Sequence, residues 1–369
     1  MKKIFFILFL SIICFSLYAQ SDRALIGIAM PETHVLRWVK DGQTLMKEAE
    51  RLGYRAELQY ANANQNTQNQ QIQNFIRQGA RVIIVGSIND GIAPVLIEAK
   101  QNGIIIIAYD RIIFNTTDVD YYITFNNYRT GEMMAQSIIN GLNLNTTILP
   151  TTKNIALFAG SPRDGNAYFY YDGAMNILNP YIDRGVLRVI GHYPRTSADR
   201  LNFEQIAIIN WQPRNARTRM EDILRNDASN LILDAILTPN DMITRAIIEV
   251  MKTDTRYSYR IPILSGQDAE YDSALLIRNG EQYSTVFKNT NRLAEAAIIL
   301  ADAVIREQTP NIPSAILASS DNLREIGNNG KKYITTYLLE PELITRNNLY
   351  IPIEAGFYEG WGNVNRLRW

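Results

Sequence analysis

The chain has 369 residues, of which 46% are hydrophobic and 20% are charged. This composition supplies enough apolar surface for folded cores and excludes a disordered chain, while the length corresponds to about two domains of ~150 residues. Basic and acidic residues number 37 each, and this balance argues against a nucleic-acid-binding protein, which needs a clustered basic excess. One cysteine, Cys14, and two histidines argue against disulfides and against Cys- or His-rich metal sites.

Residues 1–19 have the pattern of a secretory signal peptide. Lys2 and Lys3 precede an apolar run over residues 4–17. At about fourteen residues, this run is shorter than the ~20 that a membrane-spanning helix needs. We therefore expect the segment to direct export and then to be removed.

Cleavage after the small residue Ala19 would start the mature chain at Gln20. No later stretch approaches ~18 uninterrupted apolar residues, so we expect a soluble protein in the periplasm. Lipid anchoring at Cys14 is a minor alternative, because the bulky Ile13 stands where lipoprotein processing favours a small residue.

Short β-rich runs alternate with longer segments of helical periodicity from residue 24 onward, a pattern typical of a parallel sheet covered on both faces. In the first half the pattern predicts strands at 24–30, 55–60, 82–87 and 104–110. It predicts helices over 38–52, around 72–76 and over 92–102. Gly53 and Gly103 follow two of these helices, as C-terminal glycine caps do.

The same alternation restarts beyond Tyr128. Strands are predicted at 154–160, 187–193, 231–237 and 261–266, and helices around 133–138, 166–178, 213–224 and 241–251. The last hundred residues supply a helix over 269–278, a strand over 283–287, a helix over 292–306 and a polar, proline-containing tail. These elements are too few for a third domain, so we expect them to complete the two earlier halves.

We therefore predict an α/β protein with two doubly wound parallel-sheet, Rossmann-like lobes. The expected first lobe comprises 24–127 plus 267–306, and the expected second lobe comprises 128–266 plus 307–369. With these boundaries the chain crosses between the lobes more than once, as in a hinge.

Polar side chains gather where the predicted strands end, which is the edge at which open α/β sheets bind ligands. They are Asp110, Arg111, Asn126, Asn127, Asp164, Asn166, Asn240, Asp241, Asp268 and Lys288. Carboxylates, amides and fixed cations suit vicinal hydroxyl groups, each of which donates and accepts a hydrogen bond. Taken singly, each Asn or Asp is more readily explained as a helix cap, so only the set points to a site.

Aromatic residues stand close to several of these strand ends. Trp38, Trp211 and the cluster 168–171 offer flat apolar surfaces. A pyranose has both a rim of hydroxyls and an apolar C–H face that can stack on a ring, so the combination favours a sugar ligand. Ordinary core packing is the alternative explanation for each aromatic.

The sequence contains no catalytic motif of the Gly-X-Ser-X-Gly, Walker A or Gly-X-Gly-X-X-Gly kinds, so we expect neither an enzyme nor a cofactor. A carboxylate pair such as Asp110 and Asp268 could serve a glycosidase if their spacing fitted. An exported sugar-active enzyme therefore stays open as an alternative.

Seven ordered pieces of the chain carry a resemblance to a known family. They are RWVKDG (37–42), AYDR (108–111), YYITFNN (121–127), GSPRDGNAYFYYDGAM (160–175), SGQDAE (265–270), GEQYSTVFK (280–288) and YLLEP (337–341). The sequence resembles the periplasmic sugar-binding proteins of ABC importers, with the type I fold, in the xylose-binding and multiple-sugar-binding branch. The likeness covers nearly the whole mature chain.

The resemblance implies a monosaccharide in its pyranose form, held in a cleft between two lobes that close by hinge bending. It implies a monomer that delivers its sugar to an ABC permease, with a chemoreceptor or sensor kinase as a further partner; a purely signalling role stays open. The implied site residues are Arg37, Asp110, Arg111, Asn166, Asn240, Asp268 and Lys288, with Trp38 and Trp211 as stacking partners. A LacI-type repressor shares the core, but the N-terminal residues here form a secretion signal and not a helix-turn-helix.

Two positions depart from the family pattern or vary within it. Relatives usually have Asp-Asn-Asn-Ala where this chain has Asp164, Gly165, Asn166 and Ala167, so one amide is missing. Some relatives carry an aromatic residue at the position of Asn240, which could select the epimer that fits. The identity of the sugar therefore does not follow from the resemblance.

Overall fold

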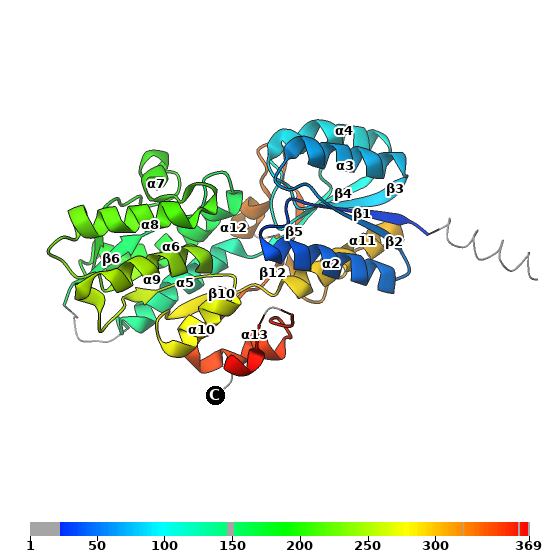
Figure 1. Cartoon of the computed structure of the whole chain (residues 1–369). Helices are drawn as coiled ribbons and strands as arrows, with labels where there is room; N and C mark the ends of the chain where they lie inside the picture. The colour runs from blue at the N-terminus through cyan, green and yellow to red at the C-terminus, as the bar shows by residue number, and fades with distance from the viewer. Residues whose placement is uncertain (1–22, 146–150, 320, 361, 368–369) are drawn as a thin grey trace, which may run out of the picture. The chain divides into compact units, whose positions relative to one another are not determined.

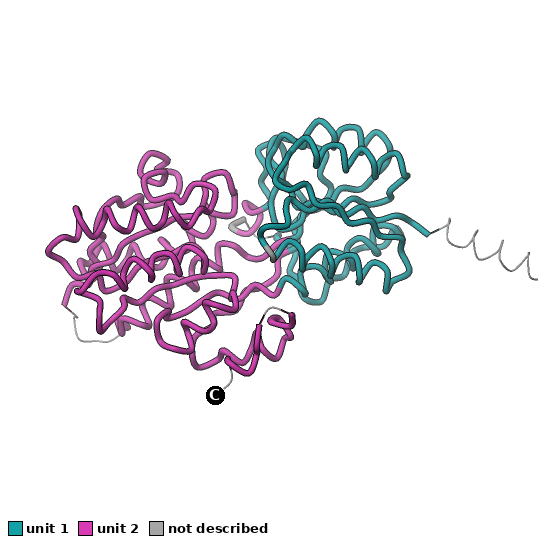
Figure 2. Tube along the Cα trace, viewed as in Figure 1, with its two compact units in different colours: residues 1–123, 290–319, 327–337 teal, residues 124–289, 320–326, 338–369 magenta. Residues whose placement is uncertain are grey.

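The computed structural model describes residues 23–145, 151–319, 321–360 and 362–367 (Figure 1). The predicted signal peptide, 1–19, and Cys14 lie outside these residues. The chain forms two compact units, the first from residues up to 123, 290–319 and 327–337, and the second from 124–289, 320–326 and 338 onward (Figure 2). Among the described residues, no helix is both long and apolar enough to cross a membrane.

The sheet of the first unit is built mainly from the strands that the sequence predicts. The strands are β1 (Leu25–Met30), β2 (Arg55–Tyr60), β3 (Ala80–Val85), β4 (Ile105–Tyr109), β5 (Tyr121–Phe125), β11 (Ala315–Leu317) and β12 (Thr335–Leu339). Their order is β11-β12-β5-β4-β3-β1-β2, and β1 pairs in parallel with both β2 and β3. The strand order reverses between β1 and β3, and such reversal points are where open α/β sheets bind ligands.

Two pairs of helices cover the two faces of this sheet (Figure 1). They are α2 (Leu36–Arg51) with α11 (Thr290–Ile305), and α3 (Gln65–Arg77) with α4 (Ala93–Gln101). Because both faces are covered, a central strand has no solvent side, and all six residues of β1 are buried. This explains why the strands appear in the sequence as continuous apolar runs.

The second unit repeats the arrangement with a smaller parallel sheet. Its strands are β6 (Lys153–Leu157), β7 (Leu187–Ile190), β8 (Ala235–Leu237) and β9 (Ile263–Leu264), in the order β7-β6-β8-β9. Its main helices are α5 (Asn127–Gly141), α6 (Gly165–Asp183), α8 (Pro213–Asp222) and α9 (Asp241–Thr253). Along β6, Ile155 and Leu157 join the core under α5 and α6, whereas Ala156 and its neighbour Phe158 join the core under α8 and α9. The two-residue period of a strand thus fills two cores at once.

Helices α5 and α6 pack with their backbones in contact. A Cβ atom placed on Gly131 would lie 1.9 Å from the carbonyl oxygen of Tyr170, and one on Gly173 would lie 2.0 Å from that of Tyr128. Only glycine permits so close an approach, since any other residue would drive the two helices apart. This contact fixes the first residues of α5 and α6 relative to each other.

The unit boundaries differ from the predicted lobes in three places. Residues 124–127 were expected in the first lobe but begin the second unit. Residues 267–289 were expected in the first lobe but belong to the second unit, because β10 (Ser284–Phe287) pairs antiparallel with β13 (Glu342–Thr345) there. Residues 307–319 and 327–337 were expected in the second lobe but belong to the first unit, where β11 and β12 extend the sheet. The two larger differences come from short strands in the polar tail.

Further short elements complete the described fold. The helices are α7 (Arg200–Ile206), α10 (Tyr271–Asn279), α12 (Asp321–Arg324) and α13 (Tyr350–Glu354). The 3₁₀ turns are η1 (Asp90–Ile92), η2 (Ile209–Trp211), η4 (Thr255–Tyr257), η5 (Glu325–Gly327), η6 (Arg346–Asn348) and η7 (Val364–Arg366), and η3 (Ile223–Asp227) is a π-helix. The predicted strands at 231–237 and 261–266 are shorter than expected, and α7 was not predicted. The predicted fold class, α/β with two parallel-sheet lobes, is confirmed.

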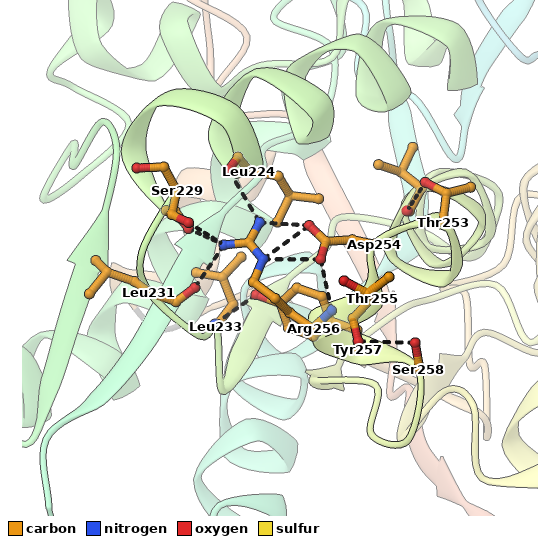
Figure 3. A network of polar contacts seen from close by, with 12 residues as sticks. Leu224, Ser229, Leu231, Leu233, Thr253, Asp254, Thr255, Arg256, Tyr257 and Ser258 are labelled. Atoms are coloured by element: carbon orange, nitrogen blue, oxygen red, sulfur yellow. Dashed lines mark hydrogen bonds and ion pairs between the residues drawn. The ribbon is translucent and has the colours of Figure 1, made fainter.

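Arg256 holds the segment over 224–231, which precedes β8, in place through hydrogen bonds (Figure 3). Its guanidinium donates to both carboxylate oxygens of Asp254 and to the carbonyl oxygens of Leu224, Ser229 and Leu231. These carbonyls follow the end of α8, where backbone acceptors lack helical partners. The planar guanidinium satisfies several of them at once, which a lysine could not do.

Candidate functional site

In the first unit, the predicted residue Asp110 directly follows β4 and pairs with Arg37 on the first turn of α2. The Arg37 Nη2 atom lies 2.6 Å from Oδ2 of Asp110. Asp110 adopts a left-handed backbone with φ of 63°, its N–H donates to the carbonyl of Ile123, and its own carbonyl accepts from the Tyr122 hydroxyl. Residues held in this region cluster at functional sites, where the surrounding structure over-determines them.

Arg37 lies at a helix N-terminus, where the helix dipole disfavours a cation. Two carboxylates offset this: Asp110, and Asp41 one turn further along α2, whose Oδ2 atom lies 3.7 Å from Nε of Arg37. The arginine is thus fixed between two acids and is not a mobile surface side chain.

Trp38 is buried, with 2% of its surface exposed. The guanidinium carbons of Arg37 and Arg111 lie 4.5 and 5.1 Å from the centre of its ring, and the ring of Tyr109 meets it edge-on at 6.5 Å. These contacts hold the two predicted arginines in place. The predicted stacking of Trp38 on a sugar stays a prediction.

Asp41 is a member of this group that sequence reasoning missed. Its side chain is fully buried, and burial raises its pKa from 3.8 to about 6, against the lowering effects of Arg37 and of the Thr290 and Tyr109 hydroxyls. Its position four residues after Arg37 in RWVKDG was the available signal, because that spacing places both on one helix face.

Replacing Asp41 by asparagine is expected to change how stability depends on pH. Because the pKa of Asp41 is higher in the folded than in the unfolded state, the folded protein binds the proton more tightly. Its contribution to the free energy of unfolding is therefore greatest below pH 4, falls as pH rises to about 6, and is constant above. A pKa difference of this size corresponds to ~3 kcal/mol. Denaturant unfolding at pH 4 to 8 should show Asp41→Asn gaining stability over wild type as pH rises.

Asp302, on α11 of the same unit, provides a control because its pKa shifts in the opposite direction. Burial raises its pKa, but hydrogen bonds from Tyr54 and Arg306 outweigh burial, so its pKa is lowered. Asp302→Asn should therefore lose stability relative to wild type as pH rises toward 4, and the difference should stay nearly constant from pH 5 to 8, where the Asp41 variant is still gaining. The same pH dependence in both variants would contradict the assignment to Asp41.

In the second unit, Asp268 and Lys288 form the corresponding pair. Asp268 also has a left-handed backbone, with φ of 94°, and its Oδ1 atom lies 3.1 Å from Nζ of Lys288. Lys288, which follows β10 and is 3% exposed, donates to the Tyr170 hydroxyl at 3.2 Å. The sequence singled out the aromatic cluster 168–171 but not the role of Tyr170 in orienting this lysine.

The Asn and Asp residues at the helix starts cap those helices, as the simpler explanation held. The N–H of Asn166 donates to Asp164 at the start of α6, and the N–H of Ile243 donates to Asn240 at the start of α9. The predicted site residue Asn166 also accepts a 2.7 Å hydrogen bond from Nδ2 of Asn127, so its side chain is fixed. Asn240 caps α9 through its side-chain oxygen. Capping does not use its NH2 group as a donor, so it is compatible with the prediction that Asn240 binds ligand.

Trp211 ends η2 in a left-handed conformation, with φ of 55°. Its ring packs beside Gly160, on which a Cβ atom would lie 2.2 Å from Cη2 of the tryptophan. The ring is partly buried and touches both cores of the second unit. Core packing therefore accounts for this contact, and stacking of Trp211 on a sugar stays a prediction.

The structure thus groups the predicted residues by unit. One group comprises Arg37, Trp38, Asp110 and Arg111, joined by Asp41; the other contains Asp268 and Lys288, joined by Tyr170. Asn166 lies in the first turn of α6, Trp211 at the end of η2 and Asn240 directly before α9, all in the second unit. In the described part of the chain, no group of acidic, His or Cys side chains could hold a metal ion.

Comparison with known proteins gives concordant results. A family model described as a periplasmic binding protein domain matches residues 26–309. The multiple sugar-binding periplasmic receptor ChvE of Rhizobium radiobacter is 35% identical over 345 residues, covering 92% of each chain. The D-xylose-binding periplasmic protein of Escherichia coli (strain K12) is 32% identical over 360 residues, covering 97% of this chain and 98% of that protein.

A solved structure extends the comparison to three dimensions. An ABC transporter solute-binding protein of Clostridium phytofermentans with bound β-D-glucose is 33% identical, has a TM-score of 0.79, and covers 93% of this chain and 100% of its own. The strand order, the residues at the strand ends and these matches agree, and the chain belongs to the periplasmic binding protein family of the type I fold.

Proposed function

We propose that this protein binds a monosaccharide as an aldopyranose, such as xylose, glucose, galactose or arabinose, and delivers it to an ABC importer. The names of its relatives support a sugar ligand, since they describe binding of multiple sugars and of D-xylose, and a similar structure holds β-D-glucose. Export by the segment 1–19 to the periplasm, and transfer of the sugar to a permease, chemoreceptor or sensor kinase, belong to this proposal.

The observation that carries the proposal is an ion pair at a strand end of each unit, in which one partner is buried and the other is partly buried. Arg37 with Asp110 and Lys288 with Asp268 present charged donors and acceptors whose positions are set before any ligand arrives. Preordered side chains lose little entropy on binding, and charge-assisted hydrogen bonds are stronger than neutral ones. Hydroxyl groups, which both donate and accept, match such mixed pairs.

We expect both ion pairs, Arg37 with Asp110 and Lys288 with Asp268, to be needed for full affinity. A hydroxyl buried without a partner costs about 1 to 3 kcal/mol, which penalises the wrong epimer. Asn240, and Gly165 where relatives have an amide, are the positions at which we expect selectivity between sugars to be set.

Calorimetric titration with the four aldoses is the direct test. We expect one sugar per chain and a Kd on the order of micromolar for the preferred aldose, about −8 kcal/mol. At 100 times Kd, that sugar should stabilise the folded protein by ~2.7 kcal/mol and raise its melting temperature. The mass of any ligand retained through purification would identify the sugar.

Two results would contradict the proposal. Absence of any thermal shift across the aldoses, with sugar alcohols and disaccharides as controls, would point to another ligand class. Turnover of a chromogenic glycoside would instead favour an enzyme. Neither is expected, since the sequence contains no catalytic motif, and the carboxylates of Asp110 and Asp268 are paired with cations and placed to accept hydrogen bonds.

A further inference from the structure

Asp241, the first residue of α9, is a fully buried carboxylate that the proposed site does not use. In the described residues it makes no ion pair, while Glu270 and Asp268 lie close enough to raise its pKa further beyond the effect of burial. Burying a charge without a cation is unfavourable for folding, so its presence calls for a reason other than stability.

Capping of α9 does not supply that reason. Asn240 already caps the helix, since its side-chain oxygen accepts from the N–H of Ile243 at 2.9 Å. Interaction with the helix dipole does not supply it either, because an exposed acid at the helix start would gain the same interaction without the cost of burial. The side chain of Asp241 instead turns toward the loop that carries Asp268.

Three donors converge on the Asp241 carboxylate. Nε2 of Gln282 donates to Oδ1 at 2.9 Å, while the Thr285 hydroxyl and the N–H of Glu270 donate to Oδ2 at 3.0 and 2.9 Å. Gly266 makes room for this, because a Cβ atom there would lie 2.2 Å from Oδ1. Asp241 therefore links the start of α9, the loop over 265–270 and β10.

The loop needs this anchoring because two successive residues in it, Asp268 and Ala269, are left-handed, with φ of 94° and 49°. Non-glycine residues are strained in this conformation and persist only where the surrounding structure holds them. The N–H of Asp268 donates to the carbonyl of Val286, and that of Ala269 donates to the hydroxyl of Thr285. The N–H of the next residue donates to Asp241, so every amide of the strained segment is held.

We infer that Asp241 is a positioning residue for ligand binding: by holding the backbone of 268–270 against β10, it directs the Asp268 carboxylate to the Lys288 ammonium and to the sugar. The inference rests on the proposed function for its ligand. Thr285 relays the effect, since its hydroxyl accepts from Ala269 and donates to Asp241.

The test compares Asp241→Asn and Thr285→Val with wild type and with Arg256→Lys. Asparagine replaces one acceptor oxygen by a donor, and valine keeps the shape of threonine but removes the relay. Arg256→Lys weakens the contacts of Figure 3 in the same unit and controls for destabilisation alone. We expect aldose Kd to rise 10-fold or more in Asp241→Asn, to rise several-fold in Thr285→Val, and to stay within 2-fold in Arg256→Lys.

Two measurements on the ligand-free protein complete the test. In Asp241→Asn, the amides of Ala269 and Glu270 should exchange hydrogen faster, and Lys288 should react faster with an amine-acylating reagent, whereas Arg256→Lys should leave both unchanged. Wild-type Kd and wild-type exchange in Asp241→Asn and Thr285→Val would overturn the inference. If wild type binds no aldose, the proposed function fails, and the exchange and labelling rates still decide whether Asp241 positions Asp268.

Discussion

Alanine in place of Asp110 or Asp268 is expected to weaken sugar binding by at least 100-fold. Each carboxylate is the charged acceptor of its unit, and each also orients the cation beside it, Arg37 or Lys288. Removing the acid therefore loses one charge-assisted hydrogen bond directly and loosens the donor next to it, for which ~3 kcal/mol, or about 100-fold, is a reasonable minimum. Calorimetric titration with the preferred aldose measures the loss.

Because both aspartates have a left-handed backbone, a second substitution can separate the effect of losing the carboxylate from the effect of backbone strain. Alanine tolerates that conformation poorly, whereas glycine adopts it freely, so Asp110→Gly and Asp268→Gly should be more stable than the alanine variants. Both kinds of variant should fail to bind. Asp183→Ala, which removes an exposed acid paired with Arg195 on the surface of the second unit, should bind as wild type does. Unchanged affinity in both alanine variants would remove these aspartates from the site.

The parallel strands could be predicted from sequence because their environment is uniform. A strand covered on both faces must be apolar throughout, and β1, β3 and β4 therefore appear as short runs of Ile, Val and Ala. The residue that ends such a run lies at the ligand-binding edge, which is why Asp110 could be selected. Lys288 was also selected as the residue after a predicted strand, although β10 pairs antiparallel with β13 and does not belong to a parallel sheet.

The unit boundaries could not be predicted in the same way. Strand β13 is a four-residue segment, ELIT, and it is a strand only because β10, more than fifty residues earlier, pairs with it. Short segments of mixed polarity carry little periodic signal, so long-range pairing decides their structure. Placing Asp268 and Lys288 in the first lobe followed from missing that pairing.

The roles of the residues that support the site could not be predicted from sequence for a related reason. Asp41 is on a helix, where a single acid in the sequence is most simply explained as solvent-exposed. Asp241 was selected as a polar residue at a strand end, but its part in holding Asp268 was not predicted. Their burial depends on neighbours from distant segments, such as Thr290 for Asp41 and Thr285 for Asp241. Sequence patterns find the residues at strand ends, but the residues that hold them in place emerge only from three-dimensional contacts.

Alanine at Gly131 is expected to cause the largest loss of stability. In an ordinary helix interior, Gly→Ala stabilises by up to ~1 kcal/mol, because glycine loses more entropy on folding. Here the added Cβ would lie 1.9 Å from the carbonyl oxygen of Tyr170, which belongs to the backbone of α6 and cannot rotate away. The helices must separate, and we expect the free energy of unfolding to fall by ~3 kcal/mol or more, or cooperative folding to be lost.

Separation of α5 from α6 should also displace residues that we propose bind the sugar. Asn127 and Asn166, in the first turns of α5 and α6, are hydrogen-bonded to each other, and Tyr170 on α6 accepts a hydrogen bond from Lys288. Urea unfolding monitored by circular dichroism, with Gln136→Ala on the half-buried side of α5 as the matched control, measures the stability change. The control should unfold close to wild type, since it places alanine on the same helix without adding a Cβ atom at the contact with α6. A transition midpoint for Gly131→Ala at or above that of wild type would show that α5 and α6 do not need their backbone contact. Side-chain packing alone would then have to explain how the starts of the two helices are positioned.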